Sequence, residues 1–175
     1  SSSTTGEAIV MTETKSISAG DVSGGDISDG DTEKEDEKNI SGESVTSGIS
    51  RGCAWTIDAE GKLVVRDSDG TYGTDNWGWK DYKDKIKTAD VNISYADLRG
   101  MLEDCISLTS AKVKIDDAVG HGTEGFFSGC VSLSDIDISG LNTQNATNMD
   151  HMFYRCGKLK YADIENFNTQ NVTDM

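Results

Sequence analysis

Apolar residues recur along the second half of the chain at intervals of 25 and 26 residues. Each copy has an aromatic residue or Leu, then Cys, then Leu, at steps of three: Leu102, Cys105 and Leu108; Phe127, Cys130 and Leu133; Phe153, Cys156 and Leu159. The stretch 141–149 (LNTQNATNM) also returns at 167–175 as FNTQNVTDM. Self-similarity at a fixed period predicts a solenoid, in which stacked units share one continuous core.

Within one unit, the apolar positions first follow the period of an α-helix. They fall at i, i+3, i+4 and i+7: Met149, Met152, Phe153 and Cys156. Thr147 suits a helix N-cap, and Gly157 suits the C-terminal cap. After Leu159 the period changes to two, so Ala162 and Ile164 would face inward from a strand. Each unit is therefore predicted to contain a short helix, a short strand and a polar turn.

The region before the repeats follows a different pattern. Residues 53–57 and 63–65 alternate between apolar and polar around a turn at 58–61, which predicts a β-hairpin. All three tryptophans lie nearby, and we interpret 48–93 as a β-rich cap on the solenoid. The predicted fold class is α/β: a leucine-rich-repeat-like solenoid over 94–175, with a helix and a strand in each repeat.

Composition separates the first part of the chain from the rest. Residues 1–50 contain no aromatic residue and carry 11 acidic against 3 basic side chains. Such a segment buries too little apolar surface to offset its ordering entropy, so we expect 1–47 to be a disordered tail. The net charge of −15 makes nucleic acids and anionic lipid surfaces poor partners. No apolar run approaches the ~20 residues of a membrane-spanning helix.

The Cys-x-x-Leu spacing and the turn at 168–175 resemble the BspA-type leucine-rich repeat family of bacterial surface proteins. The cap sequence is also similar to the start of such proteins, so the resemblance covers about 48–175. It implies a secreted or wall-associated protein that adheres to host or neighbouring-cell proteins. The first repeat departs from the family pattern at Leu102 and in the polar insertion 116–124. We expect the repeats to continue beyond Met175, where the next helix would begin.

Three of the four cysteines share one position of the repeat: Cys105, Cys130 and Cys156. They are predicted to form a buried ladder and to act as small apolar side chains. Disulfides are disfavoured because side chains in register point parallel to one another. Cys53 in the cap has no obvious partner. Zinc is not expected, because no Cys-x-x-Cys spacing occurs. Asn145 and Asn171 likewise share one repeat position, where side-chain hydrogen bonds would hold the turns together.

Two further patterns suggest chemistry without a complete set of residues for it. Asp67, Asp69 and Asp75 lie in a Gly-rich loop, which leaves calcium open as an alternative to a plain turn. Residues 48–52 (GISRG) match a nucleophile-elbow spacing, but that chemistry needs a strand-to-helix turn with a His and an acid. His121 and His151 are placed elsewhere. We therefore expect no enzyme activity, no cofactor and no metal.

The outward strand positions form the candidate protein-binding face: Lys112, Lys114, Asp135, Asp137, Tyr161, Asp163 and Glu165. In register, Lys112 would lie beside Asp137, and Asp137 beside Asp163. A plain solvated face is the alternative. Because solenoids bind through extended sheet faces, the predicted function is an extracellular protein-binding module with Tyr161 as its aromatic contact. The alternative function is a structural spacer that displays C-terminal regions.

Overall fold

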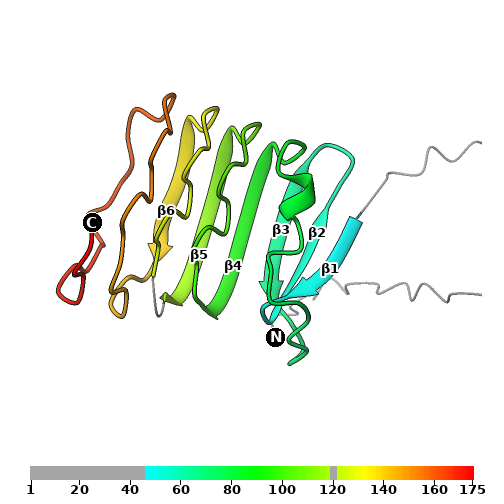
Figure 1. Cartoon of the computed structure of the whole chain (residues 1–175), viewed down its shortest axis with the longest axis horizontal. Helices are drawn as coiled ribbons and strands as arrows, with labels where there is room; N and C mark the ends of the chain where they lie inside the picture. The colour runs from blue at the N-terminus through cyan, green and yellow to red at the C-terminus, as the bar shows by residue number, and fades with distance from the viewer. Residues whose placement is uncertain (1–45, 119–121) are drawn as a thin grey trace, which may run out of the picture. The chain divides into compact units, whose positions relative to one another are not determined.

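Six strands form a single sheet in the computed structural model, which describes residues 46–118 and 122–175. The strands are β1 (Thr46–Ser50), β2 (Cys53–Ile57), β3 (Lys62–Asp67), β4 (Thr88–Ala96), β5 (Ser110–Ala118) and β6 (Asp135–Leu141). They lie side by side in chain order (Figure 1). β1 to β3 pair antiparallel, and β3 to β6 pair parallel. The expected disordered tail lies outside the described residues, except that Thr46 and Ser47 begin β1.

The parallel strands belong to a β-solenoid of about three turns, so the predicted repeat and solenoid are confirmed. Each strand is followed by an irregular stretch that runs back alongside it (Figure 1). We call these stretches return segments; they cover 98–108, 123–133 and 149–159. Alternate strand residues face inward and stack in register, as Val91 does on Val113. Apolar residues of the return segments pack onto these rows from the other side and close the core.

The α/β class is wrong, because the return segments are not helical. Among the described residues the one helical element is a 3-10 turn, η1 (Lys80–Tyr82). The predicted helix around Met149 to Cys156 is a series of tight turns: the amides of Met152 and Cys156 bond to the carbonyls three residues before them. The described chain is therefore nearly all β, with no helix in any repeat.

Left-handed backbone explains why these turns do not join into a helix. Asp104, Gly129 and Arg155 share one repeat position and have φ of 58°, 75° and 60°. Such a residue interrupts a right-handed helix. It also turns alternate amides away from their own segment. The Gly129 amide bonds the Tyr154 carbonyl of the next return segment at 2.8 Å. The apolar side chains keep their common face, while the backbone bonds connect neighbouring turns of the solenoid.

The strand expected after Leu159 is also absent. Residues 160–164 form no strand, and Ile164, expected to face inward, is 50% exposed. A strand requires a ladder partner, and no described segment pairs with this stretch. Two residues of this stretch accept local bonds instead: the Glu165 amide donates to the Asp163 carboxylate, and the Phe167 amide donates to the Ile164 carbonyl.

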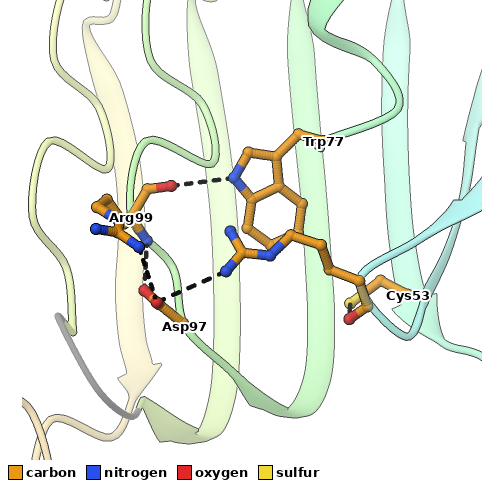
Figure 2. A network of polar contacts seen from close by, with 5 residues as sticks. Cys53, Trp77, Asp97 and Arg99 are labelled. Carbon is orange, nitrogen blue, oxygen red and sulfur yellow. Dashed lines mark hydrogen bonds and ion pairs between the residues drawn. The ribbon is translucent and has the colours of Figure 1, made fainter. Parts of the chain in front are cut away.

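The hairpin expected in the cap is confirmed as β2 and β3, paired antiparallel. The indole rings of Trp77 and Trp79 are stacked, with their centroids 5.1 Å apart. They hold the loop after β3 against the first return segment. Trp79 donates to the carbonyl of Met101 at 2.8 Å, and Trp77 donates to that of Arg99 at 3.1 Å (Figure 2). The same loop covers part of the outer edge of β1, since the Thr74 amide donates to the Ile49 carbonyl at 3.3 Å. This cover shortens the exposed edge of the sheet.

The cysteine ladder forms inside the core as expected. All four cysteines are free and buried. The Cys130 thiol donates to the Leu102 carbonyl at 3.1 Å, and the Cys156 thiol donates to the Phe127 carbonyl at 3.2 Å. Burial raises the pKa of the Cys105 thiol to about 12. These groups therefore behave as small core side chains.

The polar turns after β6 bond to their neighbours through side chains, as the shared Asn positions predicted. Asn171 donates to the carbonyl of Gln144 at 2.8 Å, and Asn145 donates to the carboxylate of Asp117 at 2.9 Å. Thr143, only 1% exposed, accepts the Asn168 amide at 2.7 Å. These bonds fix the spacing of successive turns at the edge of the solenoid.

Candidate binding face

The outer face of the sheet carries a row of residues that crosses four strands. Val64 of β3 pairs with Asp90 of β4, which pairs with Lys112 of β5, which in turn pairs with Asp137 of β6. The inward neighbours of these residues fill the core, so strand alternation places this row on the opposite, solvent side. The row presents acidic, basic and acidic groups on adjacent strands.

Charges in this row form ion pairs with each other and with Arg66 of β3. Lys112 Nζ lies 3.5 Å from Asp137 Oδ2, so the expected pairing of these two residues is confirmed. Arg66 Nη1 lies 3.1 Å from Asp90 Oδ1 and donates to the Asp90 carbonyl at 2.9 Å. The Lys112 side chain remains 71% exposed. Exposed pairs of this kind stabilise a fold by only ~0–1 kcal/mol.

Asp137 is held more firmly by its own strand than by the lysine. The Ser139 hydroxyl donates to Asp137 Oδ1 at 2.7 Å, and the Ser139 amide donates to the same oxygen at 3.2 Å. These hydrogen bonds, followed by the nearby Lys112 charge, lower the pKa of Asp137 below its usual value. The carboxylate is thus fixed in position and ionised at neutral pH.

If the register of Lys112 and Asp137 continued, Lys114 would lie beside Ser139, but the register shifts. The shift falls between Lys112 and Lys114, and Lys114 lies opposite Gly140. A Cβ at Gly140 would come within 2.9 Å of the Lys114 side chain, so the small residue allows this approach. Lys114 pairs with Asp116 on its own strand at 3.6 Å. Asp135 follows the expected register and lies opposite Ser110.

The remaining members of the predicted face do not continue the ladder. Tyr161, Asp163 and Glu165 lie in the stretch that forms no strand, and Tyr161 is 73% exposed. The expected strand pairing of Asp137 with Asp163 is therefore absent. Asp163 makes the same local turn as Asp137, its equivalent in the previous repeat, since its Oδ1 accepts the Glu165 amide at 3.1 Å.

Sequence reasoning missed the part of the face that lies on β3 and β4. Arg66, Asp90 and Asn92 share the face with Lys112. The signal was present, because inward Val91 and Ile93 require Asp90 and Asn92 to point outward.

The acidic loop and the Ser-containing motif have structural partners. Asp67 accepts bonds from the amide and hydroxyl of Ser94. Asp69 bonds the hydroxyl and amide of Thr71, which lowers its pKa. The described residues include no group of three or more side chains able to hold a metal.

Ser50 is fully buried at the β1–β2 turn and accepts the Gly78 amide. His121 lies outside the described residues. The described residues contain no helix long and apolar enough to cross a membrane.

Comparison with known proteins overturns the BspA resemblance. A family model described as "Mycoplasma protein of unknown function, DUF285" matches residues 78–175. No curated protein and no solved structure matches the chain. The matching family is thus not one of BspA-type leucine-rich repeats, and the non-helical return segments agree with this correction. The matched range holds β4 to β6 and all three return segments, and the chain belongs to the DUF285 family.

Proposed function

We propose that the chain is a protein-binding module that uses the outer face of its sheet. The observation that carries the proposal is the charged row Asp90, Lys112 and Asp137, held in register by strand pairing. A parallel ladder keeps such groups at fixed spacing, so this surface loses little conformational entropy when a partner binds. Solenoids commonly bind through extended faces of this kind.

The chemistry of the face favours a protein partner. Both signs of charge occur within one row, which matches the mixed charge of a protein surface better than a uniformly anionic polymer. The net charge of −15 opposes binding to nucleic acid. Tyr161, Asp163 and Glu165 would extend the contact surface beyond β6 as a flanking loop.

A charge exchange tests this proposal. The double variant Lys112→Asp with Asp137→Lys keeps the net charge and the ion pair but reverses their order along the row. Binding of the full chain to a panel of purified extracellular matrix and plasma proteins is measured by surface plasmon resonance. We expect saturable binding of at least one protein, weakened about tenfold by the exchange.

A second net-neutral exchange serves as the control. Lys158→Glu with Glu60→Lys changes exposed residues away from the outer face and should leave the affinity unchanged. Binding by none of the panel, or equal binding by the wild type and the Lys112/Asp137 exchange, would contradict the proposal. Circular dichroism verifies that each variant is folded.

A structural spacer is the second candidate function, and one observation favours it. The charges of the face neutralise one another: Arg66 with Asp90, Lys112 with Asp137, and Lys114 with Asp116. A face whose charges are satisfied internally needs no partner. Secretion, surface location and adhesion to host or neighbouring cells came from the BspA resemblance, and they stay predictions.

A further inference from the structure

A cationic pocket lies on the other side of the core from the sheet face, where the cap loop meets the first return segment. It is a cavity of about 270 Å³. Four basic residues line it: Arg51, Lys80, Lys83 and Arg99. They come from the β1–β2 turn, the loop around η1 and the first return segment. Such a gathering of cations is unusual in a chain whose net charge is −15.

The two arginines are held in place by an aromatic ring and a shared carboxylate. The Arg51 guanidinium lies 4.6 Å from the centre of the Trp77 ring, and the Trp77 indole donates to the Arg99 carbonyl. Asp97 Oδ2 lies 3.6 Å from both guanidinium groups. Figure 2 shows Asp97 beside Arg99, with Trp77 directed at the Arg99 backbone. One carboxylate thus serves two guanidinium groups, each of which has further donors.

The two lysines of the pocket have no ion-pair partner among the described residues. Lys80 is exposed and Lys83 is half-buried. The pocket also contains the carboxylates of Asp75 and Glu103. Even with Asp97 counted, four cations face three carboxylates, so the site keeps an excess of positive charge.

We propose that this pocket binds an acidic peptide segment of a partner protein. Its carboxylate side chains would pair with Lys80, Lys83 and the free donors of Arg51 and Arg99. A peptide with several carboxylates can meet cations from separate segments at once, which adds their contributions. Because Asp75 and Glu103 lie among the cations, the lining suits a peptide that spaces single carboxylates apart better than one phosphate group that concentrates a charge of about −1.5 to −2 at a single point. This site is separate from the sheet face and does not depend on the function proposed for that face.

Binding of a fluorescently labelled hexaglutamate peptide to the full chain tests the proposal by anisotropy. The variant Lys80→Glu with Lys83→Glu reverses the two unpaired lysines. Its matched control is Lys158→Glu with Lys160→Glu, which changes the net charge equally at exposed positions of the third return segment and the stretch after it. We expect saturable binding by the wild type and the control, and a loss of about tenfold or more in affinity for the Lys80/Lys83 variant.

Three outcomes would overturn the proposal. The wild type could fail to bind the peptide, or both double variants could weaken binding equally, which would mark a response to net charge alone. In the third outcome, sodium phosphate displaces the peptide more strongly than sodium chloride of equal ionic strength, which would identify a phosphate site. Tryptophan emission verifies that the packing of Trp77 and Trp79 is intact in each variant.

Discussion

The backbone amide of Phe127 donates a hydrogen bond of 2.9 Å to the carbonyl of Met152, one solenoid turn further along the chain. In an α-helix that amide would bond within its own segment. Leu102 makes the equivalent bond to Phe126, so the relationship repeats from turn to turn. Neighbouring return segments are therefore joined by backbone bonds opposite the sheet, and both walls of the solenoid hold the strands in register.

Replacing Gly73 with Ala should destabilise the cap more than replacing Gly70. Both residues have positive φ, so each change strains the backbone by ~1–2 kcal/mol. Only at Gly73 would the new Cβ meet backbone, at 2.1 Å from the Ile49 carbonyl oxygen; at Gly70 nothing lies within 4 Å. Urea unfolding should give Gly73→Ala the larger loss by ~1–3 kcal/mol. Equal losses would mean that the cap loop does not cover β1 as described.

Thr143→Val should cost more stability than Thr169→Val, although both residues share one repeat position. Thr143 is buried and its hydroxyl accepts the Asn168 amide, whereas Thr169 is exposed. Removing the buried acceptor leaves an amide unpaired, at a cost of ~1–3 kcal/mol. The exposed change should stay within ~0.5 kcal/mol. Thermal unfolding of the two variants measures the difference. Similar melting temperatures would argue against the buried hydrogen bond between Thr143 and the next turn.

The Asp137 carboxyl should titrate at a lower pH than an ordinary aspartate. Carbon-detected NMR can follow its pKa in the wild type, in Ser139→Ala and in Lys112→Met. We expect Ser139→Ala to raise the pKa more than Lys112→Met, since hydrogen bonds from Ser139 are the larger cause of the lowered pKa. Because the folded pKa is lowered, the stability from these bonds is present above the unfolded pKa and lost as pH falls. The opposite order of the two variants would show that the ion pair dominates.

The buried thiols should make the fold less stable in alkaline solution. Burial raises the pKa of Cys53 from 9.0 to about 11, and that of Cys105 to about 12. The unfolded chain therefore loses thiol protons first as pH rises above 9.0. This stability is complete below pH 9.0 and is lost between there and the folded pKa. Urea unfolding at pH 8 and pH 10 should show a smaller pH-dependent loss for Cys105→Ala than for the wild type. An equal loss in both proteins would show that the Cys105 thiol is not protected by the core.

Strand patterns were predictable from sequence because strand alternation fixes both faces at once. The cap hairpin, the buried cysteine ladder and the pairing of Lys112 with Asp137 all follow from a period of two and a repeat of fixed length. The stretch Tyr161 to Glu165 has the same alternation, yet it forms no strand, because alternation does not supply a ladder partner.

The return segments could not be assigned from the apolar pattern. Spacing at i, i+3, i+4 and i+7 fits an α-helix, and it equally fits tight turns that recur every fourth residue. The deciding positions carry left-handed backbone in residues other than glycine, such as Asp104, His151 and Arg155. Gly125 and Gly129, four residues apart in one repeat, were the visible sign of it.

The non-helical return segments make this fold a β-solenoid, and Arg155 offers the most direct measurement of their backbone. Arg155→Gly and Arg155→Ala both remove the same exposed side chain, so their difference reports on backbone conformation alone. With φ of 60° at this position, Gly should be more stable than Ala by ~1 kcal/mol in urea unfolding. A helical segment would give the reverse, with Ala more stable than Gly by ~1 kcal/mol, and would contradict the account.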